Sequence, residues 1–138
     1  DYNNEFEKPK MIYPNNCKKP EFTFDDASSY ANQKCFIITQ YTNTFLGILN
    51  SNLYFFLFKS ILPKLRGDFY EPSYVYFKDF PVIKTESQEI NNLVNMCLMQ
   101  KKHNPSADTT DLEIQIDQLV YQLYDLTEKD LRIVEGGE

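Results

Sequence analysis

The sequence predicts a mixed α/β (α+β) fold, with a small-sheet lobe over residues 1–84 and an α-helical hairpin over residues 85–138. Short runs rich in β-branched and aromatic residues favour strands in the first part. Apolar residues at helical spacing favour helices in the second part. The charge changes at the same boundary, because residues 1–84 hold 10 Lys/Arg and 9 Asp/Glu, whereas residues 85–138 hold 4 and 11. The resulting net charges of +1 and −7 make up the −6 of the 138-residue chain.

The lobe contains five short segments with the character of strands. β-branched and aromatic residues dominate residues 34–39, which we predict to form a central strand. Polar and apolar residues alternate over residues 21–24, as they do in a half-buried strand. Pro81 indicates the edge or the end of a sheet for the last segment. The five segments are residues 11–13, 21–24, 34–39, 74–77 and 80–83.

The most apolar stretch, residues 45–62, predicts a buried helix, because apolar side chains would occupy more than one of its faces. Asn43 or Thr44 can cap its start. Gly47 lowers the helix propensity, so we expect close backbone packing there. Polar residues interrupt the stretch and leave it short of the ~20 apolar residues that a membrane span needs, so we expect no membrane partner. Pro63 ends it, and a loop with a glycine beside an arginine follows over residues 65–72.

Amphipathic helices are predicted after residue 86. The first covers residues 87–102. Thr110 and Glu113 fit a capping box for the second, and Thr127 with Asp130 indicates a third, short helix that ends before the final glycines. The first two helices must pair to bury their apolar stripes. We expect Leu112, Ile116, Leu119 and Leu123 to pack on Ile90, Leu93, Val94 and Leu98.

Motifs for catalysis are missing from the sequence. The single histidine, His103, lies in a predicted turn, and the four glycines form no phosphate-binding loop. The polar-Pro-Pro-aromatic loop that surrounds a flipped base in amine-modifying methyltransferases is absent. Asp79, Lys84 and Glu86 do not have the arrangement of a metal-dependent nuclease. We therefore predict no catalytic residue, no metal site and no cofactor site in this chain.

The cysteines and the N-terminal residues indicate a cytoplasmic location. Cys17, Cys35 and Cys97 are odd in number, widely spaced and without a CxxC pair, which favours reduced thiols. The first ten residues are polar and charged, so no secretory signal is expected. Because the chain begins at Asp1 and not at Met, we expect that it was cut from a longer protein.

Lysine, arginine and aromatic residues share the predicted loops of the lobe. Cations neutralise phosphates, and an arginine fork can read guanine O6 and N7. A glycine beside the arginine lets the backbone approach a ligand closely. Loops of this composition are also common as solvated surface, and a protein partner would fit them as well. The candidate DNA-binding residues are Lys18, Lys19, Lys34, Lys64, Arg66, Gly67, Asp68 and Tyr70.

A series of segments in fixed order is more specific than any single loop. The series consists of Ile12-Tyr13-Pro14, Phe22-Thr23-Phe24-Asp25, Cys35 to Thr39, Leu46 to Ser51, Leu65-Arg66-Gly67, Tyr74-Val75 and Phe80-Pro81-Val82. It resembles the TaqI-like C-terminal specificity domain of type IIG restriction enzymes and of related N6-adenine DNA methyltransferases. The helix segment Leu46 to Ser51 and the Leu65-Arg66-Gly67 loop are the most telling pieces. Residues 116–136 also resemble the usual C-terminus of such enzymes.

The resemblance implies a target-recognition domain of a bacterial restriction–modification enzyme. Its partners would be double-stranded DNA and an upstream methyltransferase domain that uses S-adenosylmethionine and modifies a flipped adenine, with or without a fused endonuclease. Lys64, Arg66, Gly67 and Tyr70 would lie nearest the bases, and Asp68 would accept from a cytosine amine or orient the arginine. The phosphate contacts would come from Lys18, Lys19 and Lys34.

Two other classes of function stay open at this point. The acidic tail and the modest charge of the lobe would suit a protein-interaction or scaffold module of a defence complex without DNA contact. A free-standing enzyme is the second alternative, which the missing nucleophile, metal cluster and phosphate loop disfavour. A steep loss of DNA affinity with salt would separate DNA recognition from the interaction module.

Overall fold

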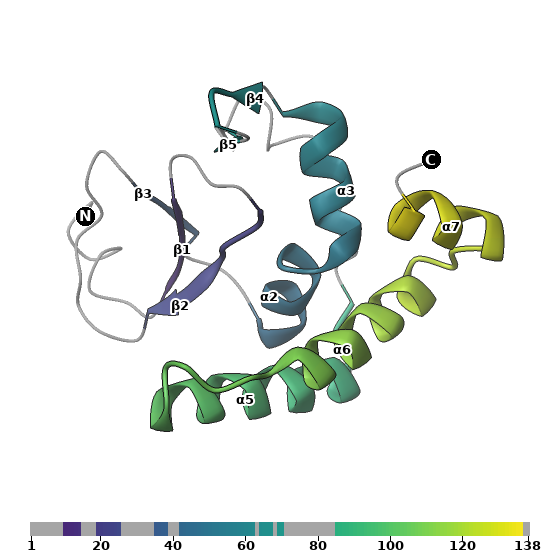
Figure 1. Cartoon of the computed structure of the whole chain (residues 1–138). Coiled ribbons are helices and arrows are strands. Elements are labelled where there is room, and N and C mark those ends of the chain that lie inside the picture. Colours follow the sequence, from purple (N-terminus) through teal and green to yellow (C-terminus); the bar gives the residue numbers. More distant parts are fainter. Residues whose placement is uncertain are drawn as a thin grey trace. The chain divides into compact units, whose positions relative to one another are not determined.

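The computed structural model of the chain describes residues 10–14, 19–25, 35–38, 42–62, 64–67, 69–70 and 85–136 (Figure 1). Most of these residues lie in five helices, and the strands among them are short. The described part of the chain therefore has mixed but mainly helical content. The predicted strands at residues 74–77 and 80–83 lie outside the described residues.

The chain divides into two compact units. The first unit contains Asp1–Tyr41 and Leu57–Pro81, and the second contains Thr42–Phe56 and Val82–Glu138. These packing units do not follow the boundary expected at residue 84, because Thr42–Phe56 belongs with the C-terminal helices. The assignment of separate roles to residues 1–84 and 85–138 stays a prediction.

Three short strands of the first unit pair in antiparallel fashion. β1 (Lys10–Pro14) lies between β2 (Thr23–Asp25) and β3 (Cys35–Ile38). Met11 pairs with Phe24 on one side and with Ile38 on the other. The strands coincide with segments whose β-branched and aromatic residues favour extended backbone. The prediction that residues 34–39 form a central strand is wrong for the described sheet, because β1 lies in its centre and β3 at one side.

The apolar stretch after residue 42 forms two helices where the sequence suggested one. α2 (Asn43–Leu49) ends at Asn50, and α3 (Asn52–Ile61) follows at once. Ser51 accounts for the break. Its Oγ donates a hydrogen bond to the Ile48 carbonyl at 2.7 Å and accepts one from the Tyr54 N–H at 3.4 Å, so it satisfies both helix ends.

The start of α2 also differs from the expectation. Thr42 is the N-cap, and its hydroxyl accepts from the Phe45 N–H at 3.1 Å. Thr44, one of the two expected caps, is buried. Its hydroxyl accepts from the Ser87 N–H at 3.0 Å and donates to Asn91 Oδ1 at 2.5 Å. A threonine that could have capped its own helix instead joins α2 to the start of α5 (Gln88–His103).

Two long helices of the second unit form the predicted hairpin. α5 (Gln88–His103) and α6 (Thr110–Leu123) run side by side, and α2 packs against both (Figure 1). The buried residues on their facing surfaces are Ile90, Val94, Ile116 and Val120. The other members of the predicted stripes, Leu93, Leu98, Leu112, Leu119 and Leu123, are half-buried. The predicted pairing of the two helices is confirmed. Their most buried residues lie on the side that α2 covers.

The helix starts in the second unit show which side chains act as caps. Ser87 caps α5 by accepting from the Ile90 N–H at 3.2 Å. The expected capping box at Thr110 is wrong, since Thr109 is the N-cap of α6 and its side chain bonds no backbone N–H of that helix. The Thr109 hydroxyl donates instead to Glu113 Oε2 at 2.9 Å. The third expected helix is α7 (Glu128–Gly136). Thr127 and Asp130 bond each other's backbone N–H reciprocally there, which is the predicted capping box.

None of the described helices is long and apolar enough to cross a membrane.

Candidate nucleic-acid interface

The segment after α3 forms a small hairpin. β4 (Lys64–Leu65) pairs antiparallel with β5 (Phe69–Tyr70), so Lys64 lies opposite Tyr70 and Leu65 lies opposite Phe69. The sequence suggested a loop here, because two-residue strands carry no periodic signal of their own. Arg66 and Gly67 stand in the turn between the strands.

Gly67 gives the hairpin its turn. Its φ of +79° is close to the +80° that the second central residue of a type II turn adopts, a value that side chains disfavour. Glycine has no Cβ and takes this conformation without strain. The glycine of the Leu65-Arg66-Gly67 segment is therefore required by the backbone.

Aromatic packing fixes the hairpin to the rest of the first unit. Tyr70 is only 8% exposed, and its ring centroid lies 6.4 Å from that of Phe58 on α3. Phe58 in turn meets Phe22 edge to face at 6.4 Å, and Leu62 is buried as well. The Phe58 contact anchors β5, so Tyr70, which was expected near DNA, packs in the core. Whether it also contacts DNA stays a prediction.

Residues around the turn are open to solvent. Arg66 and Gly67 are exposed, and so is Lys19. Leu65 and Phe69 are 37% and 36% exposed. Successive residues of a strand face opposite sides, so the burial of Tyr70 requires that Phe69 face away from the core. Neither Leu65 nor Phe69 was among the candidate DNA-binding residues, because two-residue strands carry no periodic signal that would show which side chains face outward.

The other expected site residues are only partly described. The structure gives the strand position of Lys64, and Lys18, Lys34 and Asp68 lie outside the described residues. The hairpin therefore brings Lys64, Arg66, Gly67 and Tyr70 together. Lys19 belongs to the same unit, in the segment that leads to Phe22.

Charge is distributed unevenly between the two units. Within the described residues, the first unit holds five Lys/Arg and two Asp/Glu, a net charge of +3. The second unit holds four Lys/Arg and ten Asp/Glu, a net charge of −6. The rest of the first unit's sequence holds four Lys/Arg and seven Asp/Glu, so that unit is neutral as a whole and the −6 of the chain lies in the second unit. A polyanion is therefore repelled by the second unit and much less by the first.

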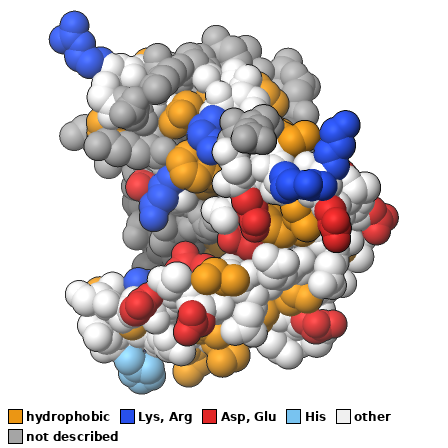
Figure 2. Space-filling view, turned by 45° about the vertical axis from the view of Figure 1, so that its right-hand side comes forward, with side chains coloured by type: hydrophobic (Ala, Val, Ile, Leu, Met, Phe, Trp, Pro, Cys, Tyr) orange, Lys and Arg blue, Asp and Glu red, His pale blue; other side chains and the backbone are white. Residues whose placement is uncertain are grey.

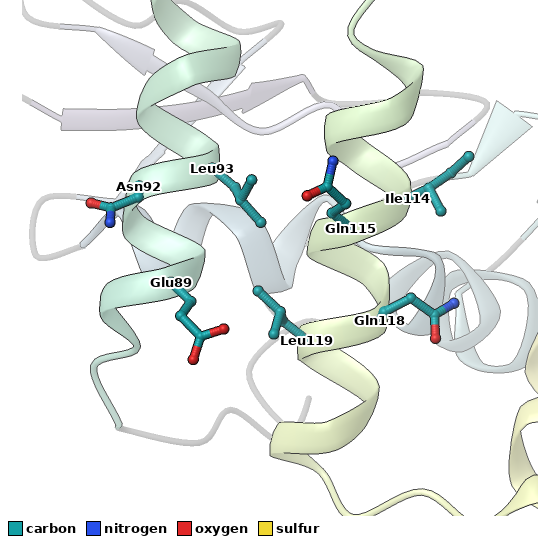
Figure 3. Close-up of a pocket in the computed structure, with 7 residues that line it drawn as sticks. All are labelled: Glu89, Asn92, Leu93, Ile114, Gln115, Gln118 and Leu119. Carbon is teal, nitrogen blue, oxygen red and sulfur yellow. The ribbon is translucent and has the colours of Figure 1, made fainter.

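A shallow groove in the second unit is the other concave feature. It has a volume of about 450 Å³ and lies between α5 and α6. Leu93 and Leu119 point toward one another across it, and Glu89 is its one carboxylate (Figure 3). The other lining residues are Asn92, Ile114, Gln115 and Gln118. Amides and leucines with a single carboxylate provide no acid–base pair, so this lining suits binding better than catalysis.

Side chains that could carry chemistry are isolated in the described part of the chain. No three His, Cys, Asp or Glu side chains gather there as a metal site would require. His103 is exposed at the end of α5 (pale blue in Figure 2). Cys97 is half-buried, and burial raises the pKa of its thiol, which disfavours the nucleophilic thiolate.

An exposed arginine turn in the unit that lacks the chain's net negative charge is typical of a binding module. The particular family follows from comparison with known proteins. The chain belongs to the family of TaqI-like C-terminal specificity domains, whose model matches residues 2–82, more than half of its length. It is thus a specificity domain of the restriction–modification type, as the ordered segments predicted. No curated protein matches the chain. The expected likeness at residues 116–136 lies beyond the matched range and stays a prediction.

Proposed function

We propose that this chain recognises a specific sequence in double-stranded DNA for a bacterial restriction–modification methyltransferase that modifies adenine at N6. The observation that carries the proposal is the match to the TaqI-like specificity domain over residues 2–82. In this proposal the lobe of residues 1–84, with its small sheet, holds the duplex, and residues 85–138 act as a spacer and docking element. The parent protein is a cytoplasmic enzyme of the type IIG class or a close relative.

The described hairpin supports this function physically. The major groove of DNA is about 12 Å wide and admits a two-stranded β-ribbon. β4 and β5 form such a ribbon with Arg66 exposed at its turn. We infer that Arg66 donates to guanine O6 and N7, that Lys64 and Asp68 act with it near the bases, and that Lys18, Lys19 and Lys34 bind phosphates. Phosphate contacts would set the register of the domain on the duplex, and the turn would supply the sequence information.

The domain's part in the reaction is to hold and orient the duplex. An upstream catalytic domain, carrying S-adenosylmethionine, would supply the methyl group and take the adenine out of the stack. This chain's residues would fix which base pair faces that domain. A domain that only positions its substrate needs no acid, base or metal of its own.

Binding measurements test the proposal. The protein is incubated with a pool of random duplexes, bound DNA is recovered and sequenced, and the affinity for the selected duplex is measured from 50 to 200 mM salt. We expect a defined consensus and a slope of log K against log [salt] of about −0.9 for each phosphate contacted.

Arg66→Ala should weaken binding to the consensus by at least tenfold, in line with the ~1–3 kcal/mol of a bidentate base contact. Arg132→Ala, an exposed arginine on α7, is the matched control and should leave affinity unchanged. Failure to enrich any sequence would exclude the proposed function.

A protein-interaction module is the second candidate function. The groove between α5 and α6, together with exposed Met96, Met99 and Ile114, favours it for the second unit. Large exposed apolar side chains on one helix pair are typical of docking surfaces. If the chain is such a module alone, its affinity for duplex DNA should be weak and the same for every sequence.

A further inference from the structure

The β4–β5 hairpin carries an apolar pair beside its arginine. Leu65 and Phe69 lie directly opposite each other in the register, and both are more than one third exposed. Directly opposed residues on an antiparallel pair have Cβ atoms roughly 5 Å apart, so the two side chains form one small apolar surface. Arg66 directly follows Leu65 and lies in the turn next to this apolar surface.

The ring of Phe69 is held against the turn. Its Cδ2 and Cε2 atoms lie 3.5 Å from the point where a Cβ on Gly67 would stand. The bare backbone of the glycine therefore forms part of the surface on which the ring rests. Because Tyr70 packs in the core, the strand direction fixes the side to which Phe69 projects. An apolar side chain that is both exposed and fixed in direction is suited to contact a partner rather than to fill the core.

We propose that Leu65 and Phe69 contact the C5 methyl groups of thymine in the major groove, beside the base pair that Arg66 contacts. This inference rests on the proposed function. The thymine methyl is the apolar group that the major-groove edges of the base pairs present, and aliphatic and aromatic side chains are its natural partners. The surroundings favour DNA over a protein partner, since the pair lies beside the exposed Arg66 and belongs to the neutral first unit, not to the second unit that carries the net charge of −6.

A comparison of thymine with uracil tests the assignment. Uracil lacks the C5 methyl but keeps the hydrogen-bonding groups of thymine. Each thymine of the selected consensus duplex is replaced by uracil in turn, and the dissociation constant is measured for the protein and for Phe69→Ala and Leu65→Ala. One buried methyl group contributes about 0.8 kcal/mol, so the unaltered protein should lose about fourfold in affinity at one or two positions. Phe69→Ala or Leu65→Ala should bind the thymine duplex more weakly and lose nothing further at those positions.

Three further variants separate this contact from other effects. Phe69→Leu keeps an apolar side chain and should retain part of the sensitivity to uracil. Met99→Ala removes an exposed apolar side chain from α5 and should leave both the affinity and the response to uracil unchanged. Phe69→Ala should also keep the salt slope of the unaltered protein, because it removes no charge, whereas Lys19→Gln, which removes a proposed phosphate contact, should reduce that slope by about 0.9. Circular dichroism and the melting temperature verify that each variant is folded.

The possible outcomes distinguish a failure of the thymine contact from a failure of the proposed DNA recognition. If a consensus is bound with a steep salt dependence but uracil has no effect, the thymine assignment is wrong and sequence recognition stands. The same conclusion follows if Phe69→Ala and Leu65→Ala both keep the full loss on uracil. If no duplex sequence is enriched at all, the proposed function and this inference fail together.

Discussion

Gly47 is the residue on which the packing of the second unit depends most directly. A Cβ at this position would lie 2.9 Å from Ile90 Cγ2, 3.0 Å from Val94 Cγ2 and 3.4 Å from Ile116 Cγ2. The three neighbours are β-branched, and their γ-methyl groups have little freedom to move. α2 can approach both long helices this closely only because it carries no side chain here, as the low helix propensity of glycine suggested.

Replacement of Gly47 by alanine should therefore destabilise the protein. Alanine gains up to about 1 kcal/mol of helix propensity, whereas overpacking a core costs about 1–3 kcal/mol. We expect a net loss of about 1 kcal/mol for Gly47→Ala and a larger loss for Gly47→Val, measured by urea unfolding. Gly136→Ala is the control, because a Cβ there meets nothing within 4 Å and should be neutral or slightly stabilising. Equal effects at the two glycines would contradict the close approach.

A partly buried carboxylate links α6 to the start of α3. Asp117 Oδ1 accepts the Asn52 N–H at 2.9 Å. Burial raises the pKa of Asp117 above its usual 3.8, and the charges of Glu113 and Glu135 act in the same direction, against the effect of the Asn52 hydrogen bond. A raised pKa in the folded state means that the folded protein binds the proton more tightly than the unfolded chain. The contribution of this residue is therefore most favourable below pH 3.8 and is lost as the pH rises through the raised pKa.

Asp117→Asn should remove this dependence on pH. The amide oxygen can still accept the Asn52 N–H, and no charge is buried, so at pH 7 the variant should be at least as stable as the unaltered protein. Asp117→Leu removes the acceptor and should cost about 1–2 kcal/mol, because the N–H at the start of α3 loses its partner. Urea unfolding at pH 4 and pH 7 checks both variants. A clear destabilisation by Asp117→Asn at pH 7 would show that the charge itself stabilises the fold.

At the scale of elements, two isoleucines within one turn of α6 differ in burial. Ile116 is 7% exposed and lies against α2, whereas Ile114 is 51% exposed at the groove. Ile116→Ala should cost about 2–4 kcal/mol through lost burial and the cavity left behind. Ile114→Ala removes the same atoms and should cost less than about 1 kcal/mol. Denaturant unfolding of the pair measures the difference, and similar losses would mean that the groove face is also covered in solution.

The helices were predicted more accurately than the elements that join or pair them. α5, α6 and α7 could be predicted because their apolar periodicity and the Thr127–Asp130 capping box are local signals. The break at Ser51 could not, since a serine's hydrogen bonds at two helix ends depend on the path of the backbone. Thr44 was mistaken for a cap because its partners, Ser87 and Asn91, are more than 40 residues away.

The candidate site could be predicted only in part, because local sequence patterns do not show tertiary packing. The Arg66–Gly67 turn stands out in the sequence, because a glycine beside an arginine is a local pattern. The inward direction of Tyr70 and the outward direction of Phe69 follow from packing on Phe58, which no local pattern reveals. Only the structure therefore shows which aromatic residues of the hairpin are buried and which are exposed.

At the scale of the whole molecule, the overall charge of −6 lies in the second unit, because the first unit holds nine Lys/Arg and nine Asp/Glu and is neutral. The described residues of the first unit carry +3 and those of the second carry −6. A lysine in the first unit should therefore contribute to phosphate binding, whereas a lysine in the second should not. Total charge alone would have argued against DNA as a partner.

Substitution of one lysine in each unit should show this difference in phosphate binding. Lys19→Gln and Lys102→Gln each remove one positive charge from an exposed position, and both therefore change the net charge of the molecule equally. If Lys19 binds a phosphate, its loss should reduce the slope of log K against log [salt] by about 0.9 and weaken binding at low salt more than at high salt, because one fewer counterion is released. Lys102→Gln, in the acidic unit, should leave the slope unchanged. Equal effects of the two variants would mean that DNA responds to the net charge of the protein and not to a surface on the first unit.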